Sequence, residues 1–329
     1  MKPKVFITRP LDGQAAVMLA AHFEVTSHQQ DTEISSDDLS AALTEAEGVV
    51  VAGARLSAPV IAQAPRLRAV SNVGVGYDNL DLAALTARRI PVTNTVGVVE
   101  ETTADLAFSL LLAAARRVVE ADRYVRERRW DRWQWHLLWG ADVHGKTLGL
   151  YGFGHIGQAV ARRARGFGMR ILYCAPHRAP KNLESELDAQ LVDRNRLIAE
   201  SDFLSLHVPL TPETRHLIGA RELARMKPSA FLINTARGPV VDEAALCKAL
   251  QLKQIAGAGL DVFEDEPRVH PDLIGFPNVV LLPHVGSATA ETRSAMARFA
   301  AQNLLDLFEG KRPVNLLNPQ VFEAGMGGR

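Results

Sequence analysis

One segment restricts the fold of this chain more than any other: TLGLYGFGHIGQAVARRARGFGMRILYC, residues 147–174. Its pattern predicts an apolar strand, a glycine turn, a helix and a second apolar strand. Gly152 permits a tight turn, Gly154 lets the backbone approach a pyrophosphate, and Gly157 allows close packing of helix on strand. A GxGxxG pattern alone is weak, but between two strands it predicts a βαβ unit that binds a dinucleotide at the helix N-terminus.

The rest of the chain alternates short apolar runs with helical patterns, which is typical of parallel sheets with crossover helices. Helices are predicted at 13–22 and 290–308. Strands are predicted at 4–9, 23–28, 47–53, 67–74, 202–208, 230–235, 257–262 and 278–284. A length of 329 residues favours two domains over one.

A long helix is predicted over residues 100–129. Its first half is apolar nearly all round, so we expect it to be deeply buried. Its second half carries arginines interspersed with Glu120, Asp122 and Glu127, which indicates a solvated face with local ion pairs rather than a nucleic-acid surface. A continuous helix here suits a bridge between domains. With the glycine motif in mid-chain, it predicts a second domain inserted into the first.

The segment that follows, WDRWQWHLLWG, holds all four tryptophans of the chain. It either packs onto its own domain or forms an arm that buries this surface against another subunit. The second alternative is favoured, because an apolar patch of that size is rarely left exposed. We therefore expect a homodimer with a dimerisation arm over residues 118–145.

Charge and cysteine content exclude several classes of protein. Lys plus Arg equals Asp plus Glu at 37 each, so no net field attracts nucleic acid or a membrane surface. The two cysteines, Cys174 and Cys247, have no paired spacing, so we expect no disulfide framework and no metal site. No signal peptide or membrane span is predicted, and a reducing, cytoplasmic location fits best.

The second strand of the βαβ unit, ending at Cys174, is not followed by the acidic residue that usually holds the adenosine ribose hydroxyls. The first acid is Glu184, and the turn carries His177, Arg178 and Lys181 instead. A carboxylate would repel a ribose 2′-phosphate, whereas a guanidinium attracts it and can bind it bidentately. The alternative is an ordinary solvated basic loop. The sequence favours NADP(H), held by His177 and Arg178, with NAD(H) as a possible second cofactor.

Three residues that can carry chemistry each follow a predicted strand: Arg237, Glu266 and His284. In an open parallel sheet they would gather at the carboxyl edge, beside the nucleotide. Each alone has an ordinary structural explanation, but together they suit hydride reduction of a keto acid. His284 would donate the proton, Glu266 would orient its imidazole, and Arg237 would bind the substrate carboxylate and polarise the carbonyl.

From about Asn72 to Pro319 the chain resembles the D-isomer-specific 2-hydroxyacid dehydrogenases, through the motifs NVGVGYDNLD, GKTLGLYGFGHIG, HVPLTPETRHLI, MKPSAFLINTARGPVVDE, GAGLDVFEDEP and LPHVGSAT. The nearest subgroup is the glyoxylate/hydroxypyruvate reductases, some of which also reduce 2-ketogluconate. The resemblance implies an α/β fold of two doubly wound parallel-sheet domains. A flavodoxin-like substrate domain would comprise residues 1–98 and 287–329, and a Rossmann cofactor domain residues 99–286.

The resemblance also implies a catalytic set matching Arg237, Glu266 and His284. Substrate contacts would come from Arg55, Val73, Gly74, Val75 and Gly76, with Arg237 and His284. Cofactor contacts would come from Gly152, Gly154, His155, Ile156, Gly157, His177, Arg178, Pro209, Thr214, Thr235, Ala236, Asp261 and Gly286. In the reductases a tryptophan of the arm reaches the other subunit's substrate site, and here the arm offers Trp135 or Trp139 for that place.

Three other functions remain open on the sequence. Another dehydrogenase of this family, of the phosphoglycerate type, normally carries a regulatory domain beyond the position of Pro319. The formate type needs an Asn–His arrangement that is not found. A dinucleotide-sensing corepressor of the same fold would keep the catalytic set, and turnover would separate it from an enzyme. The predicted function is NADPH-dependent reduction of glyoxylate, hydroxypyruvate and 2-ketogluconate.

Overall fold

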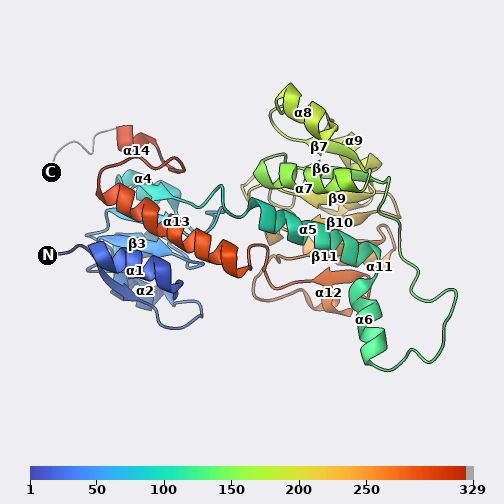
Figure 1. Ribbon diagram of the computed structural model, residues 1–329, viewed down its shortest axis with the longest axis horizontal. Helices are drawn as coiled ribbons and strands as arrows, with labels where there is room; N and C mark the ends of the chain where they lie inside the picture. The colour runs from blue at the N-terminus through green and yellow to red at the C-terminus, as the bar shows by residue number, and fades with distance from the viewer. Residues whose placement is uncertain (324–329) are drawn as a thin grey trace. The chain divides into compact units, whose positions relative to one another are not determined.

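The computed structural model describes residues 1–323, and the chain divides into two compact units (Figure 1). One unit comprises Met1–Val99 and the segment from Ser287 onward, and the other comprises Glu100–Gly286. The predicted substrate domain extends to residue 329, of which 324–329 lie outside the described part of the chain. Within residues 1–323, no helix combines the length and the apolar character that crossing a membrane requires.

The first unit is built on a five-stranded parallel sheet in the order β2-β1-β3-β4-β5. Its strands are β1 (Lys4–Ile7), β2 (Glu24–Ser27), β3 (Gly48–Val51), β4 (Ala69–Asn72) and β5 (Val92–Thr93). Its helices are α1 (Gly13–His22), α2 (Ser36–Leu43), α3 (Ala58–Ala62), α4 (Leu82–Ala87), α13 (Ala290–Phe308) and α14 (Gln320–Glu323). This strand order is that of flavodoxin-like sheets.

The second unit contains a seven-stranded parallel sheet in the order β12-β11-β10-β9-β6-β7-β8. Its strands are β6 (Thr147–Tyr151), β7 (Arg170–Cys174), β8 (Ala189–Leu191), β9 (Phe203–Leu206), β10 (Phe231–Asn234), β11 (Gly257–Leu260) and β12 (Val279–Leu281). Its helices are α5 (Glu100–Ala115), α6 (Val118–Arg126), α7 (His155–Gly166), α8 (Lys181–Leu187), α9 (Arg194–Glu200), α10 (Ala220–Leu223), α11 (Glu243–Gln251) and α12 (Pro271–Gly275), with a 3₁₀ turn at Gly238–Val240. The order is that of a Rossmann sheet with one added strand, so the predicted fold class is confirmed.

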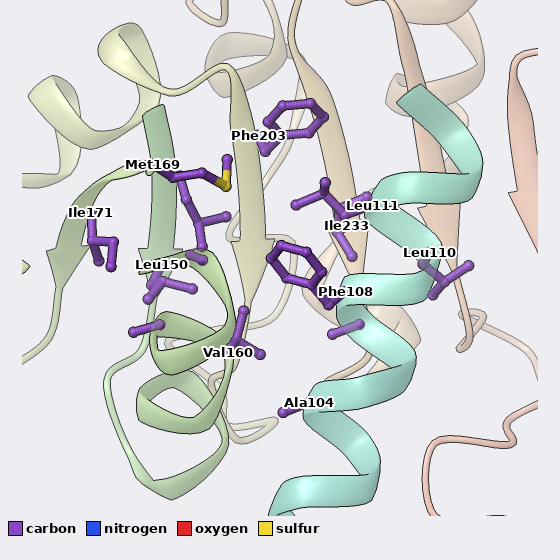
Figure 2. Close-up of a cluster of buried hydrophobic side chains, with 14 of the residues drawn as sticks. Ala104, Phe108, Leu110, Leu111, Leu150, Val160, Met169, Ile171, Phe203 and Ile233 are labelled. Atoms are coloured by element: carbon purple, nitrogen blue, oxygen red, sulfur yellow. The ribbon is translucent and has the colours of Figure 1, made fainter. Parts of the chain in front are cut away.

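Every residue of the central strands β9, β10 and β11 is buried, because helices cover both faces of the seven-stranded sheet. In β9, Phe203 contributes to the core beneath α5 and α7, whereas Leu204 contributes to the opposite core. Figure 2 shows Phe108 and Leu111 of α5 against Ile233 of β10. The predicted deep burial of this first helical segment is confirmed.

The prediction of one continuous helix over residues 100–129 is wrong. The helix ends at Ala115, and α6 begins at Val118 after Arg117 adopts a left-handed conformation with φ 54°. The cause is a tertiary contact: the carbonyl of Ala115 accepts from the amide of Ala141 at 2.8 Å instead of continuing the helix. A Cβ at Gly140 would lie 2.4 Å from that same carbonyl oxygen, so only glycine allows the approach.

The predicted ion pairs along the basic segment are confirmed. Arg117 pairs with Glu120 at 2.8 Å, and Arg126 pairs with Asp122 at 2.8 Å. These partners lie three and four positions apart, which places them on the same side of α6. Arg117 and Arg126 therefore have local counter-charges, as a solvated helix face requires.

Candidate active site

The register of the parallel strands brings the loops that can carry chemistry to one edge of the seven-stranded sheet. Tyr151, the last residue of β6, pairs with Cys174 of β7 and with Leu206 of β9. Further along the sheet, Asn234 of β10 pairs with Leu260 of β11. The loops after these strands therefore leave the sheet together. β6 lies between β7 and β9, at the switch point where doubly wound sheets bind nucleotides.

The glycine turn after β6 has the geometry that its three glycines predict. Gly152 has φ 93°, and a Cβ there would lie 2.4 Å from the carbonyl oxygen of His207. A Cβ on Gly157 would lie 2.6 Å from the carbonyl oxygen of Gly152. Gly154, the N-cap of α7, has open space at its Cβ position and supplies no capping side chain. The amides of the first turn of α7 are therefore available to an anion, which fits the pyrophosphate of a dinucleotide.

The turn after β7 places Arg178 against an acid that the sequence pattern did not connect with it. The guanidinium donates to both carboxylate oxygens of Glu184 at 2.8–3.1 Å, and Tyr173 donates its hydroxyl to the same carboxylate. Hydrogen bonds from Arg178 and Tyr173 hold the pKa of Glu184 below its ordinary value of 4.5. His177 and Lys181 lie exposed nearby in sequence. Glu184 is saturated and buried, so it is not available to ribose hydroxyls.

The remaining predicted cofactor contacts lie on loops at this edge. The Thr235 hydroxyl is buried and, within residues 1–323, has no hydrogen-bond partner, which is expected of a side chain that awaits a ligand. Thr214 donates its hydroxyl to the carbonyl of Pro209 at 2.7 Å, which closes the loop after β9. The other predicted contacts occupy the first turn of α7 or the loops after β10 and β12: His155, Ile156, Ala236 and Gly286.

His284 and Glu266 meet in a direct hydrogen bond. The imidazole Nδ1 lies 2.7 Å from a Glu266 carboxylate oxygen, and the amide of Phe263 donates to the other oxygen at 3.0 Å. Burial raises the pKa of Glu266, but the hydrogen bond and charge of His284, with the Phe263 amide and the charge of Arg237, bring it below 4.5. Glu266 is therefore a carboxylate that fixes the tautomer and the orientation of His284.

Asp261 fixes the backbone that carries His284. Its carbonyl oxygen accepts from the His284 amide at 2.8 Å, and its two carboxylate oxygens accept from the amides of Val285 and Gly286, each at 2.8 Å. His284 has φ 54°, a left-handed conformation that is uncommon for a non-glycine residue and is typical of functional sites. Burial raises the pKa of Asp261 above 3.8, although both amides and the charge of His284 oppose the shift.

Arg237 is positioned by the buried side chain of Asn234. The Asn234 amide donates to the carbonyl of Arg237 at 2.9 Å, and its oxygen accepts from the amide of Ala236 at 3.0 Å. Gly238 follows directly, and a Cβ there would lie 1.8 Å from the carbonyl carbon of Phe263, so the arginine loop rests on the loop that carries Glu266. Sequence reasoning missed Asn234, although an asparagine at the end of an apolar strand is a recognisable turn signal.

The predicted substrate loops belong to the first unit, where Arg55 follows β3 and residues 73–76 follow β4. Asn72 donates to the carbonyl of Gly76 at 2.9 Å, and Asn94 donates to the carbonyl of Val75 at 2.8 Å. Both asparagines are buried, so they hold the 73–76 loop from within. Arg55 is exposed. The approach of these residues to Arg237 and His284 stays a prediction.

The segment that carries the tryptophans exposes all of them, with Trp130, Trp133, Trp135 and Trp139 between 56% and 73% exposed. Trp133 and Trp135 contact each other edge to face at 5.9 Å. Trp139 donates its indole N–H to the carbonyl of Trp135 at 2.6 Å. The alternative that these rings pack onto their own domain does not describe this chain, because they form an exposed apolar surface.

One group of side chains has the composition of a metal site: Cys247, His270 and Asp272, whose ligand atoms lie within 4.8 Å of one another. The sequence did not predict that His270 lies near Cys247. Burial raises the pKa of the Cys247 thiol to about 11, which keeps it protonated. His270 Nδ1 accepts from the amide of Asp272 as the N-cap of α12. These groups are therefore accounted for by packing and capping.

Sequence comparison places the chain among known enzymes. Residues 108–286 match the family described as D-isomer specific 2-hydroxyacid dehydrogenase, NAD binding domain. Over 328 residues the chain is 50% identical to a glyoxylate reductase of Korarchaeum cryptofilum, with 98% of each chain covered. It is also 50% identical over 328 residues to a glyoxylate reductase of Thermococcus gammatolerans, again with 98% of each chain covered.

Solved structures give the same result. A Thermus thermophilus protein superimposes with a TM-score of 0.89 and 42% identity, covering 95% of this chain and 99% of that chain. The NADPH-dependent glyoxylate/hydroxypyruvate reductase of Sinorhizobium meliloti, solved in complex with NADP and malonate, superimposes with a TM-score of 0.88 and 36% identity. It covers 96% of this chain and 97% of that chain.

Proposed function

Since this chain belongs to the D-isomer-specific 2-hydroxyacid dehydrogenases and is an NAD(P)-dependent oxidoreductase, we propose that it reduces glyoxylate and hydroxypyruvate with NADPH. The products are 2-hydroxy acids, of D configuration where a stereocentre forms. 2-Ketogluconate is a further candidate substrate, because it presents the same keto-acid headgroup. Two relatives that are 50% identical over nearly the whole chain carry the name glyoxylate reductase, which supports the first substrate.

The cofactor site is formed by the glycine turn and the loops beside it. The amides at the start of α7 bind the pyrophosphate, and the unpartnered hydroxyl of Thr235 is available to a bound nucleotide. NADPH is preferred because the turn after β7 presents Arg178 with His177, and because the carboxylate of Glu184, the first acid after this strand, is already bound by Arg178 and Tyr173. The reductase of S. meliloti, solved with NADP, supports the same preference.

The chemistry is carbonyl reduction, for which NADPH supplies a hydride to the keto carbon when bound. The carbonyl oxygen then takes a proton from Nε2 of His284, the ring nitrogen that Glu266 leaves free. Glu266 stays ionised and stabilises the imidazolium before transfer. Arg237 binds the substrate carboxylate and stabilises the charge that develops on oxygen. Arg55 and the 73–76 loop of the first unit are the further candidate contacts for the substrate.

The observation that carries this proposal is the His284–Glu266 hydrogen bond of 2.7 Å at the same sheet edge as the glycine turn. Initial rates with glyoxylate, hydroxypyruvate and 2-ketogluconate, each with NADPH and with NADH, test it. We expect turnover of the first two acids and a higher kcat/KM with NADPH. Equal kcat/KM values for the two cofactors would remove the NADPH preference. Absence of turnover with all three acids would overturn the substrate assignment.

We also propose that the chain forms a homodimer through the arm at residues 118–145. The exposed tryptophans support this, because a monomer would leave them in water. Light scattering should give twice the chain mass of 35.9 kDa, and a monomer would contradict the proposal. If Trp135 or Trp139 reaches the partner's substrate site, its change to Ala should raise KM for the keto acid while the dimer persists. Both cysteines are free thiols, which supports a reducing, cytoplasmic location.

A further inference from the structure

Arg178 is held by a hydrogen-bond network that begins in the core below the turn after β7. Its Nε and Nη2 donate to the Glu184 carboxylate at 3.0 and 2.8 Å, and the Tyr173 hydroxyl donates to the same carboxylate at 2.5 Å. The amide of Ala179 donates to the Tyr173 hydroxyl at 3.0 Å. Tyr173 is fully buried, and the Glu184 side chain is only 10% exposed. The network is thus shielded from water as far as the guanidinium.

The same tyrosine reaches the other cofactor loop. Its ring stacks on Phe153, the residue between the first two glycines of the turn, with centroids 4.1 Å apart and planes 17° apart. Tyr173 therefore contacts the glycine turn through its ring and the basic turn through its hydroxyl. One rigid side chain therefore links the glycine turn, the candidate pyrophosphate site, with the turn after β7 that carries Arg178.

The guanidinium of Arg178 is occupied on one edge only by this network. Glu184 takes the edge formed by Nε and Nη2. The guanidinium is a planar fork of five donors, so the end formed by Nη1 and Nη2 points away from that carboxylate. The Arg178 side chain as a whole is 62% exposed, so this end is accessible to a ligand in solution.

We propose that Glu184 and Tyr173 are positioning residues for cofactor selection: they hold Arg178 so that its open end meets the 2′-phosphate of NADPH. This inference rests on the proposed NADPH preference and assigns it a structural origin beyond Arg178 itself. Neither residue touches the nucleotide. Their contribution is to fix in advance a long side chain that would otherwise lose its rotamer freedom on binding.

Glu184 also carries a negative charge, which opposes the binding of a phosphate. The opposing charge acts across an exposed guanidinium, where water and salt screen it. The ordering of Arg178 is not screened, because it comes from direct hydrogen bonds to a buried carboxylate. We therefore expect positioning to outweigh repulsion, and loss of Glu184 to weaken NADPH binding.

The test is calorimetric titration with 2′,5′-ADP and 5′-ADP, followed by KM for NADPH and for NADH. Glu184→Gln should weaken 2′,5′-ADP about 10-fold and leave 5′-ADP unchanged. Tyr173→Phe, which removes one hydrogen-bonding hydroxyl, should weaken it about 3-fold. Glu184→Asp keeps the charge but draws the carboxylate back, so positioning predicts a loss and a purely electrostatic role predicts none. Unchanged 5′-ADP affinity shows that each variant is folded.

Glu186→Gln is the matched control, since Glu186 lies on the same helix and pairs only loosely with Arg162 at 3.7 Å. Arg178→Ala distinguishes the proposed NADPH preference from the proposed positioning of Arg178. If wild type and Arg178→Ala bind 2′,5′-ADP equally, Arg178 does not bind the 2′-phosphate and the proposed NADPH preference is overturned. If Arg178→Ala loses affinity while Glu184→Gln and Glu184→Asp keep it or bind more tightly, the positioning role is overturned and the preference stands.

Discussion

Two basic side chains of the cofactor unit, His284 and Arg178, each bind a carboxylate, but they differ in how firmly the backbone around them is held. His284 hydrogen-bonds Glu266, with side chains 49% and 35% exposed, and Arg178 pairs with Glu184, with side chains 62% and 10% exposed. Around His284 the backbone is also fixed, because Asp261 accepts from the amides of residues 284, 285 and 286. Around Arg178 the backbone is held at one point, where the amide of Ala179 donates to the Tyr173 hydroxyl at 3.0 Å, and the guanidinium is held by Glu184.

This difference matches the role proposed for each group. A proton donor must hold its reacting atom within a fraction of an ångström, because misplacement costs rate steeply. A residue that selects between two cofactors needs only to meet a phosphate in a broad, solvated region. The comparison predicts that changes around His284 alter the chemical step, whereas changes around Arg178 alter selectivity.

Removal of the proposed proton donor should give the largest effect. His284→Ala should lower kcat roughly 10³-fold, because general acid catalysis of this kind contributes on that scale. NADPH affinity, followed by cofactor titration, should remain within about twofold, since the His284 side chain is not among the proposed cofactor contacts. His28→Ala, a surface histidine of the other unit beside Thr32, is the control. Normal turnover in His284→Ala would show that another group donates the proton. The firm anchoring of His284 would then have no link to the chemical step.

Arg237→Lys should come next. Lysine keeps the positive charge but lacks the planar fork that binds a carboxylate, so kcat/KM for glyoxylate should fall roughly 10²-fold. Arg268→Lys, on the loop that carries Glu266, is a matched control because Arg268 pairs with Asp265 on the surface. A defect confined to the KM for NADPH would show that Arg237 contributes to cofactor binding and not to binding of the substrate carboxylate.

Much of the fold could be predicted from the sequence, where local signals decide the structure. Helices α1 and α13 have the predicted bounds, and Asp12 and Thr289, whose side chains are visible in the sequence, cap the N-terminus of each. The edge strands β5 and β8 were not predicted, because neither lies in an apolar run as long as the one that reveals β12. The break at Arg117 was missed, since a contact from residue 141 causes it.

The candidate site divides along the same line. The pairing of Glu266 with His284 followed from complementary chemistry at one sheet edge, and the structure contains that hydrogen bond. Asn234 was missed although an asparagine at the end of an apolar strand is a turn signal. The anchoring role of Asp261 was not predictable, because it acts through backbone amides that leave no mark on composition. Glu184 lies six positions after Arg178, and only the turn into α8 brings its carboxylate back to the guanidinium.

Asp261→Asn tests whether the anchored backbone around His284 is what distinguishes this region from the region around Arg178. The new amide would point a donor at one of the amides of Val285 and Gly286, leaving that buried amide unsatisfied. The free energy of unfolding should fall by about 1–3 kcal/mol, and kcat by about 10-fold as His284 loses its fixed position. Urea denaturation and steady-state rates measure these effects. Asp265→Asn is the control, because Asp265 is exposed and pairs with Arg268 at the surface. An unchanged kcat in Asp261→Asn would contradict the anchoring role.

The smallest expected effect is a pH dependence of stability, measured by urea denaturation of wild type and Glu266→Gln. The pKa of Glu266 lies below 4.5 in the folded chain, so the unfolded chain binds the proton more readily. The pairing therefore stabilises the fold above about pH 4.5, and that stability is lost as the pH falls through the lowered pKa. The half-exposed pair should contribute below about 1 kcal/mol.

The pKa of Glu184 is also lowered, but there the leading cause is the hydrogen bond from Arg178, whereas burial opposes the shift as the leading influence at Glu266. Because both pKa values are lowered, each stability gap should close as the pH falls below about 4.5. A gap between wild type and Glu266→Gln that stays constant over this range would show that the pairing with His284 does not stabilise the fold. The fixed position of His284 would then rest on the backbone anchoring by Asp261, which is the feature that separates it from Arg178.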